Sequence, residues 1–144
     1  MKIISGGQTG ADRGGLEGAK RAGVETGGTA PLNYYTERGN DPSLSDFGLV
    51  ECTRWGYPAR TEANVKNSDG TVLFADKDRS TGTLLTIKLC KENNKPYILN
   101  PSIEELRKFS HDKGILNIAG NRESVVPGLQ QRVSDTMYKL LSEK

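Results

Sequence analysis

Apolar positions along the chain alternate between short runs and longer stretches in which they recur every three or four residues. The runs at 2–5, 71–75, 96–99 and 115–119 predict strands, and the run at 71–75 is typical of a strand covered on both faces. The stretches between them predict amphipathic helices. Strands alternating with helices at this spacing indicate an α/β fold, a three-layer sandwich with a mostly parallel sheet, whose post-strand loops share one edge.

Local signals indicate where the helices begin. Thr9 with Asp12, and Ser102 with Glu105, match the capping box, in which a hydroxyl and a carboxylate satisfy free backbone donors. Pro127 suits the first turn of the last helix, because the N–H that proline lacks has no partner there. The sequence therefore predicts capped helices after the first and third strands and a final helix from about Pro127.

The last helix carries a long apolar stripe of Leu129, Val133, Met137, Leu140 and Leu141. Two interpretations are open. The stripe can pack on the sheet, as amphipathic helices usually do, or the end of the helix can extend past the sheet and pair with a second copy. We expect a homodimer or a larger symmetric homo-oligomer, with the ligand pockets near its interface.

One long segment, from Glu25 to Pro58, interrupts the alternation. It is polar and rich in glycine and proline, with scattered aromatic residues. A connection of this length without structure of its own is uncommon unless it lines a site or moves. We therefore expect its part from Gly28 to Pro58 to supply a wall or lid, with Trp55 or Tyr57 available to stack on a base or a pterin.

Composition narrows the classes of partner. The 144 residues suffice for a single ligand-binding domain, 1–144, with a substantial core. The net charge of +2, with both signs interleaved, provides no basic stripe for nucleic acid, and no apolar run approaches the roughly 20 residues of a membrane helix. Cys52 and Cys90 are too few for a disulfide framework. We expect a cytoplasmic protein with a small-molecule ligand and no nucleic-acid or membrane partner.

The candidate chemistry begins at residues 5–13, where Ser-Gly-Gly-Gln-Thr-Gly-Ala-Asp-Arg joins the first strand to the first helix. Glycines let a ligand approach the backbone closely, and the first N–H groups of a helix attract anions. The spacing differs from the dinucleotide fingerprint, and the lysine of a P-loop is absent. This loop predicts a cradle for a phosphate-bearing small molecule. The alternative is a tight turn without a ligand.

Two more post-strand segments, 80–86 and 121–124, and the helix start at 57–64 offer hydroxyl, amide and guanidinium groups. Meeting at one sheet edge, these groups would suit a phosphate or another oxyanion, with Arg13 and Arg122 matching its charge. Helix capping and a solvated helix start are the alternatives. The predicted ligand-binding residues are Gly6, Gly7, Gln8, Thr9, Gly10, Asp12, Arg13, Tyr57, Arg60, Thr61, Asn64, Ser80, Thr81, Gly82, Thr83, Thr86, Asn121, Arg122 and Ser124.

Metal and nucleophile signals are weak. His111 is the single histidine and is expected at the surface, and Cys90 is expected in the core. Asp76 and Asp78 follow a strand, where they could hold a ribose hydroxyl or Mg²⁺, although a polar loop explains them as well. We identify no metal ligands and no catalytic set.

Four segments together resemble a known family: Ser5–Arg13, Arg60–Val65, Gly82–Thr86 and Asn117–Ser124. The family is named "putative molybdenum carrier" and forms the circularly permuted YpsA branch of the SLOG superfamily. The resemblance covers nearly the whole chain and implies a Rossmann-like fold with a pocket for a nucleotide or nucleotide-derived ligand. The family name implies the molybdenum cofactor, a phosphate-bearing pterin, as an alternative.

SLOG relatives of the LOG type are phosphoribohydrolases whose signature resembles Pro-Gly-Gly-x-Gly-Thr-x-x-Glu. Here Thr86 stands where the glutamate would be, and a hydroxyl cannot replace the carboxylate that cleavage of an N-glycosidic bond needs. Asn121 stands where many members of the family have proline. The main hypothesis is therefore a binding protein that acts as sensor, carrier or sponge. The alternatives are a molybdenum cofactor carrier and a nucleotide hydrolase using Asp12 or Glu62.

Overall fold

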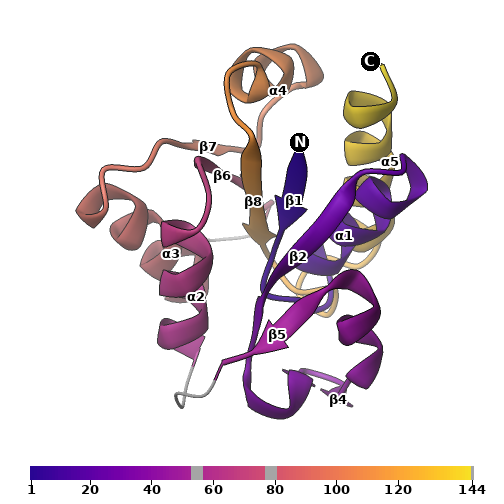
Figure 1. Ribbon diagram of the computed structural model, residues 1–144, viewed down its shortest axis with the longest axis vertical. Helices are drawn as coiled ribbons and strands as arrows, with labels where there is room; N and C mark the ends of the chain where they lie inside the picture. Colours follow the sequence, from indigo (N-terminus) through magenta and orange to yellow (C-terminus); the bar gives the residue numbers. More distant parts are fainter. Residues whose placement is uncertain (53–56, 77–80, 144) are drawn as a thin grey trace.

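The computed structural model describes residues 1–52, 57–76 and 81–143. Six strands form one parallel sheet (Figure 1) in the order β5-β2-β1-β8-β6-β7. Their bounds are β1 Lys2–Ile4, β2 Glu25–Ala30, β5 Leu49–Glu51, β6 Gly70–Phe74, β7 Tyr97–Leu99 and β8 Ile115–Gly120. The predicted α/β fold with a mostly parallel sheet is confirmed, and the sheet is Rossmann-like.

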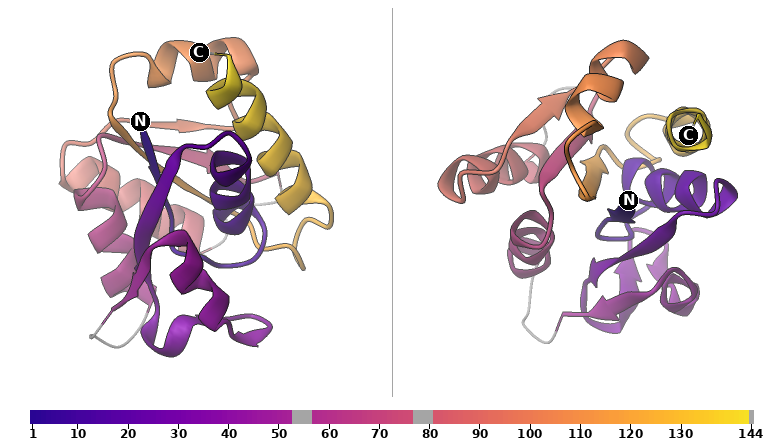
Figure 2. Two further views of the ribbon diagram at one scale, coloured as in Figure 1. Left: turned by 45° about the vertical axis from the view of Figure 1, so that its right-hand side comes forward. Right: turned by 45° about the horizontal axis from the view of Figure 1, so that its top comes forward.

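Helices cover both faces of the sheet, which gives three layers (Figure 2). α1 (Ala11–Arg21) and α5 (Leu129–Ser142) pack together on one face, and α4 (Ile103–Ser110) contacts α5 there. α2 (Tyr57–Lys66) and α3 (Thr81–Glu92) pack together on the opposite face. The next strand along the chain, β2, lies beside β1 on one side, whereas β8 and then β6 lie on the other side of β1. Ligands of open parallel sheets bind where the strand order reverses in this way.

The stripe of α5 is buried within the monomer. Leu129, Val133, Met137, Leu140 and Leu141 all belong to the main core cluster, together with residues of α1, α4 and the sheet. The α1 glycines allow this packing, since a Cβ on Gly14 or on Gly18 would lie 2.5 Å from a carbonyl oxygen of α5. The stripe therefore packs inward, and it gives no support to the homo-oligomer, which stays a prediction.

The segment from Glu25 to Pro58 has structure of its own, so reading it as a connection without secondary structure is wrong. It contributes β2 and β5 to the sheet, the short helices η1 (Leu32–Tyr34) and η2 (Pro42–Phe47), and a hairpin of β3 (Tyr35–Thr36) and β4 (Gly39–Asn40). A second core cluster, centred on Leu44, Phe47 and Leu49, fixes it against α1. The sequence does not indicate a strand at β2, because β2 reads Glu-Thr-Gly-Gly-Thr-Ala, without an apolar run.

The two predicted capping boxes differ in outcome. Ser102 and Glu105 form theirs, with the Ser102 hydroxyl accepting from the Glu105 N–H at 3.1 Å and the carboxylate accepting from the Ser102 N–H at 2.9 Å. Thr9 and Asp12 do not, because α1 begins after Gly10, a residue at φ 85° that has no side-chain cap. Their side chains serve other contacts, described below.

The last helix also begins later than predicted. Gly128, at φ 89°, precedes the first residue of α5, so Pro127 lies before the helix and not in its first turn.

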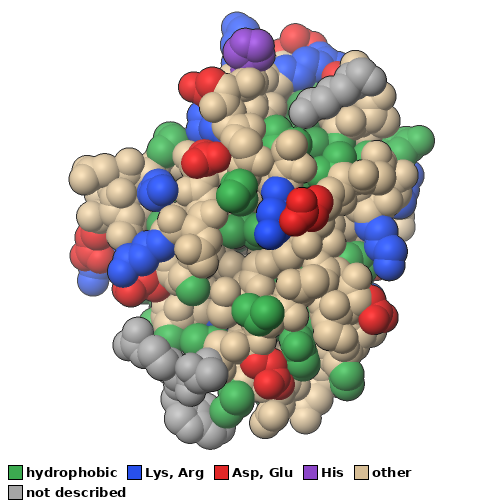
Figure 3. Space-filling model, viewed as in Figure 1, with side chains coloured by type: hydrophobic (Ala, Val, Ile, Leu, Met, Phe, Trp, Pro, Cys, Tyr) green, Lys and Arg blue, Asp and Glu red, His purple; other side chains and the backbone are tan. Residues whose placement is uncertain are grey.

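On the face of the molecule in Figure 3, positive and negative side chains are scattered without a large patch of one sign. Within the described ranges, no helix has both the length and the hydropathy needed to cross a lipid bilayer.

Candidate functional site

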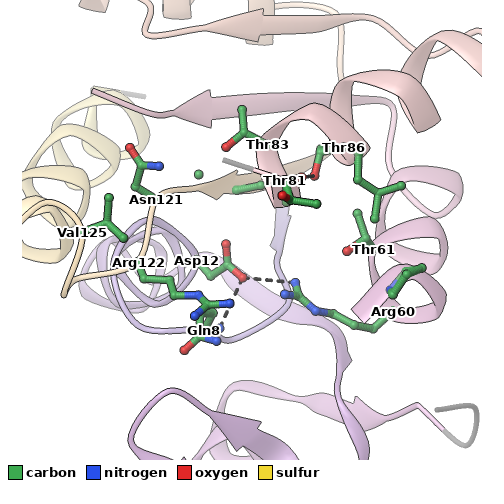
Figure 4. A pocket seen from close by; sticks show the side chains of 15 residues that line it. Gln8, Asp12, Arg60, Thr61, Thr81, Thr83, Thr86, Asn121, Arg122 and Val125 are labelled. Atoms are coloured by element: carbon green, nitrogen blue, oxygen red, sulfur yellow. Dashed lines mark hydrogen bonds and ion pairs between the residues drawn. The ribbon is translucent and has the colours of Figure 1, made fainter. Parts of the chain in front are cut away.

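A cavity of about 560 Å³ opens at the carboxyl ends of β1, β6 and β8. Its walls come from the glycine loop at 5–10 with the first turn of α1, from α2, from the start of α3, and from the turn at 120–125 (Figure 4). The lining consists of Gln8, Asp12, Pro58, Arg60, Thr61, Thr81, Gly82, Thr83, Leu85, Thr86, Ala119, Gly120, Asn121, Arg122 and Val125.

The lining and the predicted ligand-binding set overlap in part. The side chain of Tyr57, together with Trp55 and Ser80, falls outside the described residues. The predicted residues that the cavity brings together are Gln8, Asp12, Arg60, Thr61, Thr81, Gly82, Thr83, Thr86, Asn121 and Arg122. Those that do not line it are Gly6, Gly7, Thr9, Gly10, Arg13, Asn64 and Ser124.

The glycine loop is not an open phosphate cradle, contrary to the expectation from its sequence. The backbone N–H groups of residues 7–11 all donate within the chain, to Ser5 Oγ, Asp12 Oδ2, Gln8 Oε1, Gln130 Oε1 and the Asn121 carbonyl oxygen, at distances of 3.0 to 3.2 Å. An anion could use these donors only by displacing a partner that already satisfies them.

An internal anion occupies the loop instead. The carboxylate of Asp12, which is buried, accepts from the Gln8 N–H at 3.2 Å and pairs with Arg60 Nη1 at 3.3 Å. Burial raises the pKa of Asp12 above its usual value, and the neighbouring Arg60 guanidinium opposes that rise. Gly6 makes the pair possible, because a Cβ there would lie 1.8 Å from the Arg60 guanidinium.

A second carboxylate, Glu37 of the β3–β4 hairpin, binds the same loop next to Gln8 without itself lining the cavity. It accepts from the hydroxyls of Thr9 and Ser124, and from the Ser124 N–H at 3.3 Å. Partial burial opposes ionisation, but these donors and the nearby charge of Arg122 hold the pKa of Glu37 below its usual value. Thr9 and Ser124, both predicted to bind the ligand, thus bind a side chain that the sequence did not single out.

The remaining predicted residues outside the cavity also have structural partners. Arg13 pairs with Asp41 at 2.6 Å and lies over the Phe47 ring. The Asn64 amide accepts from the Thr29 N–H at 2.9 Å and donates to the Thr29 carbonyl at 3.0 Å, which ties α2 to β2. Both side chains therefore stabilise the fold, and neither reaches the cavity.

The opposite wall of the cavity is built from α3. Figure 4 shows Thr81, Thr83 and Thr86 across the cavity from Asp12 and Gln8. Thr83 and Thr86 are buried, whereas Thr81 and Gly82, at the start of the helix, are exposed. The Thr86 hydroxyl donates to the Gly82 carbonyl at 2.9 Å, so its oxygen can only accept from a ligand. This wall combines hydroxyl groups with the positive end of a helix dipole.

The turn at 120–125 closes the cavity between these two walls. Arg122 and Asn121 contribute a guanidinium and an amide, and Val125 adds an apolar side chain to a lining that also includes Leu85 of α3. A Cβ on Gly120, at φ 148°, would lie 2.0 Å from the Phe74 carbonyl oxygen. Glycine is therefore required where β8 turns toward the cavity.

Other candidate groups lie elsewhere. Cys90 is buried in the core, as predicted, and burial raises the pKa of its thiol. Asp76 pairs with Arg132, while Asp78 falls outside the described residues. Glu62 pairs with Lys66 and does not line the cavity. Among the residues that the structure describes, no three His, Cys, Asp or Glu side chains gather as a metal site would require.

Comparison with known proteins places these features in a family. The sequence model of the Circularly permutated YpsA SLOG family matches residues 3–141. A crystal structure from Syntrophus aciditrophicus SB, described as a "putative molybdenum carrier protein", superposes with a TM-score of 0.84 at 33% identity, covering 97% of this chain and 93% of that one. No match is found among curated proteins.

Proposed function

Because the chain belongs to the Circularly permutated YpsA SLOG family, we propose that it is a carrier whose cavity binds an oxyanion-bearing small molecule. The single observation that carries this proposal is the composition of the cavity lining. The guanidinium of Arg122 and the threonine hydroxyls at the start of α3 gather in one cavity, and Asp12, the one carboxylate among its described lining residues, is paired with Arg60.

The dimensions and polarity of the cavity agree with this role. A volume of about 560 Å³ falls within the range of about 300–1,000 Å³ that is usual for small-molecule sites. Apolar surface for an uncharged ring comes from Leu85, Val125 and Pro58, and hydrogen bonds from the polar groups would fix the orientation of the ligand. A ligand with one oxyanion group and one heterocycle fits both parts of this lining.

The first candidate ligand is the molybdenum cofactor or a related molybdenum species. The 33% identical crystal structure carries the molybdenum carrier name, and this reverses the order in which the sequence alone placed the candidates. No cluster of metal-ligating side chains exists among the described residues. Molybdenum carried here would therefore be recognised through its oxygen atoms or the phosphate of its pterin, by hydrogen bonds and not by protein ligands.

The second candidate is a nucleotide-derived ligand, which presents the same two parts, a phosphate and a heterocycle. The apolar contacts from Leu85 and Val125 favour it equally. Hydrolysis of such a ligand has less support, since Thr86 lacks a carboxylate and Asp12, the carboxylate in the described lining, already accepts from Gln8 and Arg60.

The test is to identify what the purified protein carries. The protein is denatured, and the released material is analysed for molybdenum by inductively coupled plasma mass spectrometry, for pterin by fluorescence, and for nucleotides by mass spectrometry. We expect one oxyanion-bearing compound near one equivalent per chain, and an Arg122→Ala preparation carrying much less. If the native protein neither carries nor binds molybdate, pterin phosphates or nucleotides, the proposal is wrong.

A further inference from the structure

Two arginines and two carboxylates lie in or beside the cavity. Arg60 lies beside Asp12 at 3.3 Å. The second arginine of the lining, Arg122, acts electrostatically on Glu37, which lies outside the lining and binds Ser124 two residues further along the turn. The described lining holds two arginines and one carboxylate, and the charge of Glu37 near Arg122 offsets the remaining positive charge. The pair of arginines alone would suggest a strongly anion-selective site.

Glu37 is fixed in its place by several contacts. Its carboxylate accepts from two hydroxyls and one backbone N–H, and its own N–H donates to Gln8 Oε1 at 2.9 Å. Gln8 lines the cavity, so a single residue connects the cavity wall to the backbone of Glu37. A ligand cannot move this negative charge without breaking all these hydrogen bonds, and we therefore treat it as permanent.

The side-chain NH₂ group of Gln8 is left to donate. The residue is 6% exposed, and Nε2 has no hydrogen-bond partner among the described residues, whereas Oε1 accepts from the N–H groups of Thr9 and Glu37. An amide N–H donates to charged and neutral acceptors alike, and beside the fixed charge of Glu37 a neutral acceptor such as a carbonyl oxygen or ring nitrogen is the one that meets no repulsion. The end of the cavity next to Glu37 thus combines a free donor with a fixed negative charge.

We propose that Glu37 is a specificity-determining residue that limits the ligand to one phosphate or equivalent oxyanion group. This inference rests on the proposed function. One oxyanion is accommodated between Arg122 and the start of α3, and the neutral end of the ligand lies toward Gln8. A second phosphate, as in a diphosphate, extends the negative charge toward the Glu37 carboxylate, and the repulsion lowers its affinity.

The test measures binding of inorganic phosphate and pyrophosphate at pH 7 by calorimetry, with the intact chain and three variants. Glu37→Gln keeps the shape and removes the charge. Glu37→Asp keeps the charge and alters the hydrogen bonds to Thr9 and Ser124. Glu25→Gln, at the opposite edge of the sheet and paired with Lys2, is the control for loss of one negative charge. Far-ultraviolet circular dichroism confirms that each variant is folded.

We expect the native protein to prefer phosphate. In Glu37→Gln the ratio of pyrophosphate to phosphate affinity should rise by about tenfold or more, as removal of one nearby charge in a partly buried site implies. Glu37→Asp and Glu25→Gln should leave the ratio within about threefold of the native value.

Three other outcomes would each contradict either the role of Glu37 or the proposed function. An unchanged ratio in Glu37→Gln overturns the selectivity role of Glu37 while leaving the oxyanion site intact. An equal rise in Glu37→Asp overturns it as well, because geometry and not charge would then be responsible. If neither probe binds the native protein or Glu37→Gln, the proposed function itself fails, and the selectivity proposal fails with it.

Discussion

The glycine loop and the start of α3 both follow a strand and both enter a helix, yet they differ in what their polar groups contact. In the loop, the N–H groups of residues 7–11 donate to the chain itself. At the start of α3, Thr81 and Gly82 are exposed and Thr83 and Thr86 line the cavity. The two segments have similar sequences at the start of a helix, but the polar groups of the glycine loop stabilise the fold, whereas those of α3 line the cavity.

The glycines of the loop and of α1 show the same difference. A Cβ on Gly10 would lie 2.3 Å from the Asn121 carbonyl oxygen, and one on Gly15 would lie 2.7 Å from the Ile118 side chain. Each of these glycines is required by a close approach of the protein to itself. A glycine-rich turn before a helix thus indicates that something approaches the backbone closely, and in this protein the approaching groups belong to the same chain.

The largest effect should come from removing the internal cation of the loop. Arg60→Met leaves the buried Asp12 carboxylate without its guanidinium, and we expect the free energy of unfolding to fall by about 3–5 kcal/mol. Arg13→Met is the matched control, because its pair with Asp41 is more exposed, and it should cost less than about 1 kcal/mol. Urea unfolding of both variants measures the difference, and equal losses would contradict the assigned role of Asp12 and Arg60.

The next effect concerns the loop backbone. Gly10→Ala introduces a Cβ both at φ 85° and within 2.3 Å of a carbonyl oxygen, so it should destabilise the protein by about 3 kcal/mol. Gly23→Ala also sits at positive φ, 73°, but nothing lies within 4 Å of its Cβ, and it should cost about 1 kcal/mol. Thermal unfolding distinguishes them. A Gly10→Ala protein as stable as Gly23→Ala would show that the loop opens readily and is available to a ligand after all.

On the ligand side, two arginines are compared by binding. Arg122→Ala should weaken oxyanion binding by about 1.5–3 kcal/mol, the usual contribution of a hydrogen bond to a charged group. Arg13→Ala should leave affinity unchanged, since Arg13 lies outside the cavity lining, although its sequence position suggested a direct contact. Isothermal titration with phosphate checks both. If only Arg13→Ala weakened binding, the oxyanion would bind at the glycine loop and not in the cavity.

The smallest effect is a pair of opposite pH dependences. Burial raises the pKa of Asp12 above 3.8, so the stability of the native protein relative to Asp12→Asn should fall as pH rises through the folded-state pKa. The pKa of Glu37 is lowered from 4.5, so stability relative to Glu37→Gln should be present above pH 4.5 and fall as pH drops below it. Urea unfolding between pH 3 and pH 7 gives both slopes, and slopes of the same sign would contradict this assignment.

Much of the fold could be predicted from the sequence because its central strands are apolar runs. β6 and β8 are such runs, and the capping box that local spacing indicated at Ser102 is formed, whereas the one at Thr9 is not. β2 and β5 could not be predicted in this way. β2 consists largely of Gly and Thr, and β5 has only two apolar residues within a polar segment. Their place in the sheet is fixed by tertiary packing of Leu44 and Leu49.

The convergence of the loops on one cavity was predictable, and the contacts of their side chains were not. Post-strand loops of a parallel sheet meet at one edge, and residues from the three predicted loops line one cavity. The internal carboxylates were not predictable, because Glu37 reaches Thr9 and Asp41 reaches Arg13 across 28 positions in sequence. A polar residue in a loop gives no sequence signal of whether its partner is a ligand or a distant side chain.

The central claim is that an oxyanion binds between Arg122 and the start of α3, and not on the N–H groups of the glycine loop. Crystals soaked in molybdate test it directly, because the anomalous signal of molybdenum locates the ion. We predict a single peak inside the cavity, within reach of Arg122 and Thr81, with the internal hydrogen bonds of residues 7–11 intact. A peak against the N–H groups of Gly7–Gly10, with the Asp12 carboxylate displaced, would contradict the account.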